Sequence, residues 1–193
     1  MFEKLTLLFN IGRAHGIARR YFIVNGFDGA LTMLGLIMGF YVSEHVNQLV
    51  VLNACLGAAI ALGMSGLTSA YISEAAEKKK ELHQLEDAMV KDLGDSAYGQ
   101  ATRLLPFVIA LVNGLAPLVI SLFIILPLWS TRFALIFPFA PLETALLMSL
   151  AVVFMLGVFL GRISETFWLW AGLRTLLVAA ATAGLIFLLS PHH

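Results

Sequence analysis

The sequence predicts an all-α polytopic membrane protein with five transmembrane helices per protomer. Composition is the first reason: of 193 residues, 60% are hydrophobic and only 12% are charged, and the mean hydropathy is +0.90. Soluble domains carry about twice that charged fraction, so much of this surface is expected to face a bilayer. The second reason is a set of five apolar segments, each near the roughly 20 residues that cross a bilayer. The third is the uneven distribution of basic residues along the chain.

Composition and motifs also exclude several functions. The formal net charge is zero, so no global field attracts nucleic acid, and we expect no nucleic-acid partner. Cys55 is the single cysteine, which excludes a disulfide framework or a Cys-based metal site within one chain. The sequence contains no G-x-S-x-G, H-E-x-x-H, Walker loop or G-x-G-x-x-G. We therefore expect neither an enzyme nor a bound cofactor.

The elements are expected in a simple order. Residues 1–20 are mildly amphipathic and lack the features of a cleavable signal, which favours an interfacial helix on the membrane surface over a frayed tail. Residues 21–73 hold transmembrane helices 1–2, residues 74–103 form a cytoplasmic helical extension and loop, and residues 104–190 hold helices 3–5. The five apolar segments are 21–43, 48–73, 104–128, 142–161 and 167–190. We expect three prolines to break up the third span: Pro106, Pro117 and Pro127.

Lys and Arg residues set the expected orientation. Five spans with the N-terminus inside put ten of the twelve on the inner side, with Arg132 outside and Arg174 within the last span. By the positive-inside rule, the N-terminus and the long polar loop face the cytoplasm, and the C-terminus faces out. Since no targeting segment is visible, we expect a prokaryotic cytoplasmic membrane.

Asp28 is the plainest candidate for a functional residue. It lies about seven residues, or roughly 10 Å, into the first span, where an ionisable group costs several kcal/mol and needs a partner or a role. Asn25 and Thr32 share its helical face and add oxygen ligands of the kind that hard divalent cations prefer. One alternative is a buried ion pair with Arg174, which lies at a similar depth in the last span.

Acidic residues also follow the second span. Glu74 and Glu77 fall where this helix leaves the membrane, which suits a mouth for cation entry. The alternative is a solvated helix face with i,i+4 pairing, such as Glu74 with Lys78. We further expect Gly35 and Gly39 of the first span to meet the small residues of the second, because small residues let helices approach closely in lipid.

The motif R-R-Y-x5-F-D-G-A-L-T-x-L-G-L-x-x-G, from Arg19 to Gly39, resembles the first-helix signature of the vacuolar iron transporter family. Ser65 to Glu77 resembles the end of the family's second helix. The spans LLPFVIALVNGLAPLVI and AGLRTLLVAAATAGLIFLL are similar to its third and fifth. The resemblance implies a five-helix protomer in a homodimer, with a pathway between helices one and two at the two-fold axis. It implies export of Fe²⁺ or Mn²⁺ from the cytosol in exchange for protons.

Residue by residue, Asp28 matches the family's intramembrane Asp. Glu74 and Glu77 correspond to its acidic extension of helix two. The family's S-M-x-x-G-E-Y differs here, where Ser65 is followed by Gly66 and Ala70 precedes Tyr71, so Met64 is the candidate thioether ligand. The segment of about 30 residues after helix two is shorter than the cytoplasmic metal-binding domain of eukaryotic members.

The predicted function is therefore a divalent cation exporter, with membrane lipids, the transported metal ion and a second copy of the chain as partners. The expected metal site comprises Asp28, Glu74, Glu77, Asn25, Thr32 and Met64. One alternative is a non-transporting membrane protein of the same fold that serves metal sensing or partner assembly. Another is a transporter for a different solute.

Overall fold

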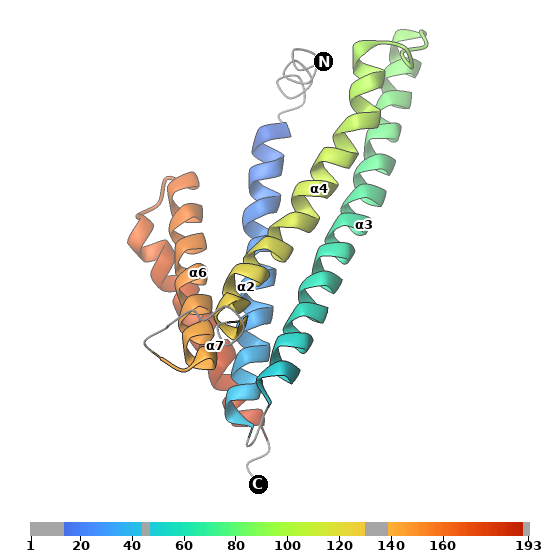
Figure 1. Ribbon diagram of the computed structural model, residues 1–193. Coiled ribbons are helices and arrows are strands. Elements are labelled where there is room, and N and C mark those ends of the chain that lie inside the picture. The colour runs from blue at the N-terminus through green and yellow to red at the C-terminus, as the bar shows by residue number, and fades with distance from the viewer. Residues whose placement is uncertain (1–13, 44–46, 130–138, 191–193) are drawn as a thin grey trace.

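The computed structural model is all-helical in the part of the chain that it describes, residues 14–43, 47–129 and 139–190. Its five long helices are α2 (Ala14–Val42), α3 (Gln48–Met89), α4 (Ala97–Ile125), α6 (Pro141–Ile163) and α7 (Trp168–Leu189), shown in Figure 1. A short 3₁₀ turn, η1 (Leu126–Trp129), extends α4. All five helices are long and apolar enough to cross a membrane. The predicted fold class is confirmed to this extent.

The starts of α2 and α4 differ from the sequence prediction, whereas the expected helical extension after the second span is present as the end of α3. Residues 14–20, expected within a separate interfacial helix, form the first turns of α2; residues 1–13 lie outside the described part of the chain. The second span and much of the polar extension form one helix of 42 residues, α3, which ends at Met89. Residues 90–96 then form a turn, and α4 begins at Ala97 with the Ser96 side chain accepting a hydrogen bond from the Gly99 N–H.

The helices pass alternately up and down. The start of α2, the α3–α4 turn and the α6–α7 turn are at the upper ends of their helices in Figure 1, and the α3–α4 pair extends furthest in that direction. Each described Lys and Arg lies in a turn at the upper end or in the half of its helix nearest that end. This gathering of positive charge is the pattern expected for a cytoplasmic face. Lys4, Arg13 and Arg132 are outside the described residues.

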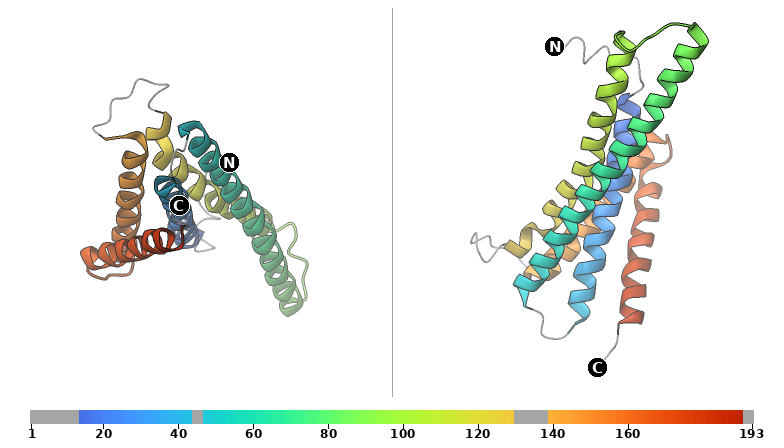
Figure 2. Two further views of the ribbon diagram at one scale, coloured as in Figure 1. Left: turned by 90° about the horizontal axis from the view of Figure 1, so that it is seen from below. Right: turned by 90° about the vertical axis from the view of Figure 1, so that its right-hand side faces the viewer.

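Helix α2 occupies the centre of the bundle. It contacts α3, α4, α6 and α7, and Figure 2 shows it between the α3–α4 pair and the α6–α7 pair. The buried core is built where these helices meet, with fully buried Met33 and Leu34 of α2 against Ile124 of α4 and Val153 of α6. Because α2 contacts four other helices, only part of its surface is exposed on the protomer.

Close approach of the helices depends on glycine. A Cβ on Gly29 of α2 would lie 2.8 Å from the backbone of Pro117, and one on Gly114 of α4 would lie 2.6 Å from the Gly63 carbonyl oxygen. By contrast, Gly35 has only Ile186 of α7 nearby, and no described atom lies within 4 Å of a Cβ on Gly39. The expectation that Gly35 and Gly39 meet the second span is therefore wrong within the protomer. The glycines that pack lie one to three turns earlier.

The prolines of the third span do not interrupt it as expected. Helix α4 continues through Pro106 and Pro117, and Pro127 lies in the 3₁₀ turn that follows. Both internal prolines are buried against neighbouring helices. Proline is tolerated in membrane helices when neighbours satisfy the backbone groups that it leaves free, and here the surrounding helices provide that packing.

Candidate functional site

A polar cluster joins α2, α3 and α4 inside the bundle; it comprises Tyr21, Asn25, Gly66, Glu74 and Asn113. Asn113 of α4 is 5% exposed, and its Nδ2 donates a hydrogen bond of 2.6 Å to the Gly66 carbonyl oxygen. Asn25 Nδ2 in turn donates to Asn113 Oδ1 and to its own helix, at the Tyr21 carbonyl, 2.9 Å away. A side-chain amide thus ties three helices together at one level.

The local sequence explains why Asn113 can reach both neighbours. Pro117, one turn later, has no N–H to donate to the Asn113 carbonyl, which frees that oxygen. Gly66 lets α3 approach, because a Cβ there would lie 3.0 Å from the Asn113 carbonyl oxygen. Gly29 does the same for α2 against Pro117. Gly66 and Gly29 therefore let three backbones come close enough for a short amide to bridge them.

Glu74 belongs to the second half of this cluster. It is only 7% exposed, and its Oε1 accepts a hydrogen bond of 2.9 Å from the Tyr21 hydroxyl of α2. The two residues are 53 positions apart in the sequence. We expected Glu74 to line a solvated mouth; the structure instead buries it between α2 and α3. Glu77, one turn further along α3, is exposed and keeps the position expected of a mouth residue.

The other predicted ligands lie on different faces. Asp28 is exposed on the surface of the protomer and Thr32 is half-buried. Met64 of α3 is 59% exposed. Within the described residues, no group of three or more His, Cys, Asp or Glu side chains is placed to hold a metal ion. One protomer therefore does not bring the six predicted ligands into a single centre.

The alternative ion pair between Asp28 and Arg174 is not formed. Ion pairs in the described part of the chain join Lys78 to Glu81 and His83 to Glu86. Arg174 instead places its guanidinium 5.9 Å from the centre of the Trp170 ring, a distance suited to a cation–π contact. Asp28 consequently has no cationic partner among the described residues of its own chain.

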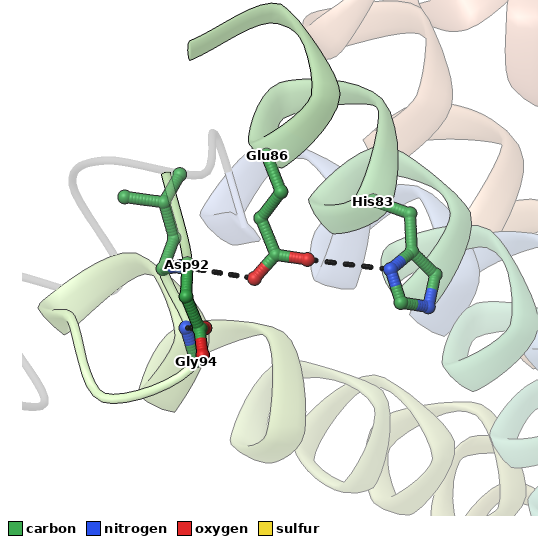
Figure 3. Close-up of polar contacts among 5 residues, drawn as sticks. His83, Glu86, Asp92 and Gly94 are labelled. Carbon is green, nitrogen blue, oxygen red and sulfur yellow. Dashed lines mark hydrogen bonds and ion pairs between the residues drawn. The ribbon is translucent and has the colours of Figure 1, made fainter. Parts of the chain in front are cut away.

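The end of α3 uses its acidic residues for structure. Figure 3 shows the Glu86 carboxylate facing His83, with Nδ1 and Oε2 3.3 Å apart. The other oxygen, Oε1, accepts a hydrogen bond of 3.0 Å from the Leu93 N–H in the turn. Asp92 accepts a bond of 2.8 Å from the Gly94 N–H in the same turn. Glu86 therefore fixes the α3–α4 turn. Earlier in α3, Lys78 pairs with Glu81 at 2.6 Å, not with Glu74.

Sequence reasoning missed Asn113. The signal was available: a lone amide in the apolar run IALVNGLAPLV is expensive in a bilayer and is a functional or structural candidate by default. What the sequence alone does not give is its partners, since Asn25 and Gly66 lie on helices 88 and 47 residues away.

Comparisons with known proteins give one informative relative. The chain is 29% identical, over 174 residues, to the "Uncharacterized protein MJ0645" of Methanocaldococcus jannaschii, and the aligned part covers 88% of this chain and 87% of that protein. No family model matches the chain, and no solved structure matches it. The similarity therefore extends over most of both chains, and the relative's name carries no activity.

Proposed function

We propose that this protein is a homodimeric transporter that moves Fe²⁺ or Mn²⁺ out of the cytoplasm of a prokaryotic cell in exchange for protons. The proposal rests on the position of Asp28, its exposure and its lack of an ion pair among the described residues. Its carboxylate lies within the apolar part of α2, is exposed on the protomer surface, and has no ion pair in the described residues. A carboxylate that faces acyl chains costs several kcal/mol. It requires a partner from outside the protomer.

A second copy of the chain and a cation together supply that partner. In a two-fold dimer that joins the exposed faces of α2 and α3, the two Asp28 carboxylates approach the axis. Two carboxylates and nearby hydroxyl oxygens suit a hard divalent cation. When the cation leaves, the low dielectric favours a proton in its place. This exchange couples metal movement to proton movement in the opposite direction.

The other residues take more limited roles in this proposal. Thr32, one turn from Asp28, supplies a hydroxyl oxygen, and exposed Met64 supplies a thioether from α3. Glu77 collects the cation at the cytoplasmic mouth. Asn25 and Glu74 are committed to the polar cluster, so we assign them to holding α2, α3 and α4 together. The resemblance of the Arg19 to Gly39 motif to iron transporters supports the choice of metal.

The experiment that tests the proposal is transport into liposomes. Purified protein is reconstituted in vesicles that hold a metal-sensitive dye, and Mn²⁺ or Fe²⁺ is added outside across a pH gradient. We expect metal entry with the natural chain and entry at the protein-free rate with Asp28→Asn. Asp28→Asn keeps the size of the side chain and removes its charge, so the helix packing is retained.

Asp95→Asn is the matched control, because Asp95 is an exposed residue of the α3–α4 turn and the same chemical change occurs outside the bilayer. It should transport as the natural chain does. Full transport by Asp28→Asn, in protein that is folded and dimeric, would contradict the site assignment. Absence of transport by every variant, the natural chain included, would contradict the transport function itself.

One observation favours a second candidate, a metal sensor that keeps the fold without transport. The buried Glu74 carboxylate is engaged by Tyr21, and the Asn25–Asn113 contact closes the interface between α2 and α4. A sensor would bind Mn²⁺ in an Asp28-dependent manner but show no vesicle uptake. Binding without flux would therefore select this candidate.

A further inference from the structure

A cationic pocket lies between α3 and α4, the two helices that run side by side up to the α3–α4 turn (Figure 1). Its volume is about 360 Å³, and its polar lining consists of Tyr71, Lys79 and His83 of α3 with Thr102 and Arg103 of α4. No acidic residue lines it. The pocket is separate from the exposed Asp28 of α2 and is not needed for the transport proposal.

The charges of this pocket are available to a ligand. Neither Lys79 nor Arg103 forms an ion pair with any carboxylate of the described residues, although Lys78, the immediate neighbour, is paired with Glu81. The Tyr71 hydroxyl has no hydrogen-bond partner in the described part either. Two free cations and a free hydroxyl around one cavity form a site for an anion, and Arg in particular binds phosphate through two parallel hydrogen bonds.

An apolar groove continues the pocket along the same pair of helices. This groove has a volume of about 240 Å³ and is lined by Leu67, Tyr71, Phe107, Ala110 and Leu111. Tyr71 lines both spaces, so the cationic pocket and the groove meet at its ring. Leu67 and Leu111 lie further inside the apolar spans than Lys79 and Arg103, and the groove therefore runs from the pocket toward the membrane interior.

We infer that the two spaces form one binding site for an anionic phospholipid of the leaflet on the basic side. The phosphate of the headgroup lies between Lys79 and Arg103, and the start of an acyl chain lies in the groove over Phe107 and Leu111. Basic pockets between transmembrane helices on the cytoplasmic side are suited to anionic headgroups. Tyr71 stands at the boundary, as aromatic residues with one polar end do at membrane interfaces.

The geometry distinguishes this ligand from a soluble phosphate. Along α3, the rise from Tyr71 to Lys79, eight positions later, is about 12 Å at 1.5 Å per residue, enough for a headgroup and its glycerol. A soluble anion would use the cations alone and leave the groove empty. A neutral lipid would use the groove alone. Because the cationic pocket adjoins the apolar groove, the two together fit a molecule with both a negatively charged phosphate and an apolar chain.

Native mass spectrometry of the detergent-purified chain tests the inference. Phosphatidylglycerol, phosphatidylcholine and inorganic phosphate are titrated separately. We expect retention of phosphatidylglycerol, weak retention of phosphatidylcholine, and no displacement of the bound anionic lipid by millimolar phosphate. The double variant Lys79→Gln/Arg103→Gln should bind phosphatidylglycerol about 30-fold more weakly, because each basic residue near a lipid surface contributes roughly a fivefold change.

The control double variant is Lys80→Gln/Lys91→Gln, which loses the same charge from exposed residues that do not line the pocket. It should retain phosphatidylglycerol as the natural chain does. Equal loss in both double variants would overturn the inference, since it would show a diffuse charge effect. Displacement by phosphate would also overturn it and identify a site for a soluble anion. If every variant retained phosphatidylglycerol and phosphatidylcholine equally, lipid binding would depend on apolar contact alone, and the inference would again be overturned.

Discussion

The Tyr21 hydroxyl donates a hydrogen bond of 2.9 Å to Glu74 Oε1 and thereby joins α2 to α3 near the basic end of the bundle. Glu74 is 7% exposed, so its carboxylate depends on this contact for polar stabilisation. A buried acceptor left without its donor costs more than the bond itself contributes. The contact makes Glu74 part of the scaffold and leaves Glu77 as the acidic residue at the surface.

Replacing Tyr21 by Phe should therefore destabilise the bundle. We expect a loss of about 1–3 kcal/mol, because the Glu74 carboxylate stays buried without a donor. Thermal unfolding in detergent measures the change. The matched variant Glu74→Gln keeps an acceptor oxygen in the same position and removes the charge, so it should cost less. A Tyr21→Phe protein as stable as the natural chain would show that Glu74 is satisfied in another way.

Asn25 and Asn113 should be energetically coupled. Asn25→Leu leaves Asn113 Oδ1 without its donor, and Asn113→Leu leaves Asn25 with only its bond to the Tyr21 carbonyl, whereas the double variant removes both side-chain amides. Hydrogen bonds between membrane helices contribute about 0.6 kcal/mol on average and up to about 1.7 kcal/mol, and we expect a coupling energy in this range. A double-mutant cycle on the free energy of unfolding measures it. Strictly additive single effects would contradict the contact.

Gly29 should tolerate no side chain. A Cβ at this position would lie 2.8 Å from the Pro117 backbone, so Gly29→Ala should push α2 away from α4 and cost about 1–3 kcal/mol. Gly184→Ala is the control, since no described atom lies within 4 Å of a Cβ there, and it should leave the melting temperature nearly unchanged. Similar melting temperatures for the two variants would show that α2 does not pack on Pro117.

Val90 offers a stabilising substitution. It ends α3 in the left-handed conformation with φ of 50° and is 92% exposed, so its side chain gains no packing for the strain. Left-handed backbone costs a non-glycine residue about 1–2 kcal/mol, and more for a β-branched one. Val90→Gly should therefore raise the free energy of unfolding of the α3–α4 turn by about 1 kcal/mol. Faster amide hydrogen exchange in residues 86–97 of the variant would contradict this.

The five long apolar helices could be predicted because hydropathy is a local property. The hydropathy of each apolar segment depends only on its own residues. Each of the five expected segments lies within one long helix apart from at most three residues at an end. The continuation of α3 to Met89 followed the same logic, since the polar stretch contains strong helix formers such as Lys80, Glu81 and Leu82. Only the exact ends of the helices could not be predicted without the tertiary structure.

Prediction of the site was less complete because its contacts are long-range. The acidic pattern after the second span could not show that Tyr21, on another helix, would bury Glu74. The i+4 spacing of Gly35 and Gly39 resembles a packing motif, but Gly29 and Gly114 make the close contacts. The sequence predicted Asp28 as an intramembrane carboxylate, and under the proposed function its exposed position in the protomer calls for a partner from outside.

The most direct test of the central proposal is equilibrium binding of radioactive Mn²⁺ to the purified chain and to Asp28→Asn. A site shared across a two-fold axis predicts about one Asp28-dependent ion for every two chains, absent from Asp28→Asn and retained by Asp95→Asn. Unchanged Mn²⁺ binding by folded Asp28→Asn protein would contradict the account.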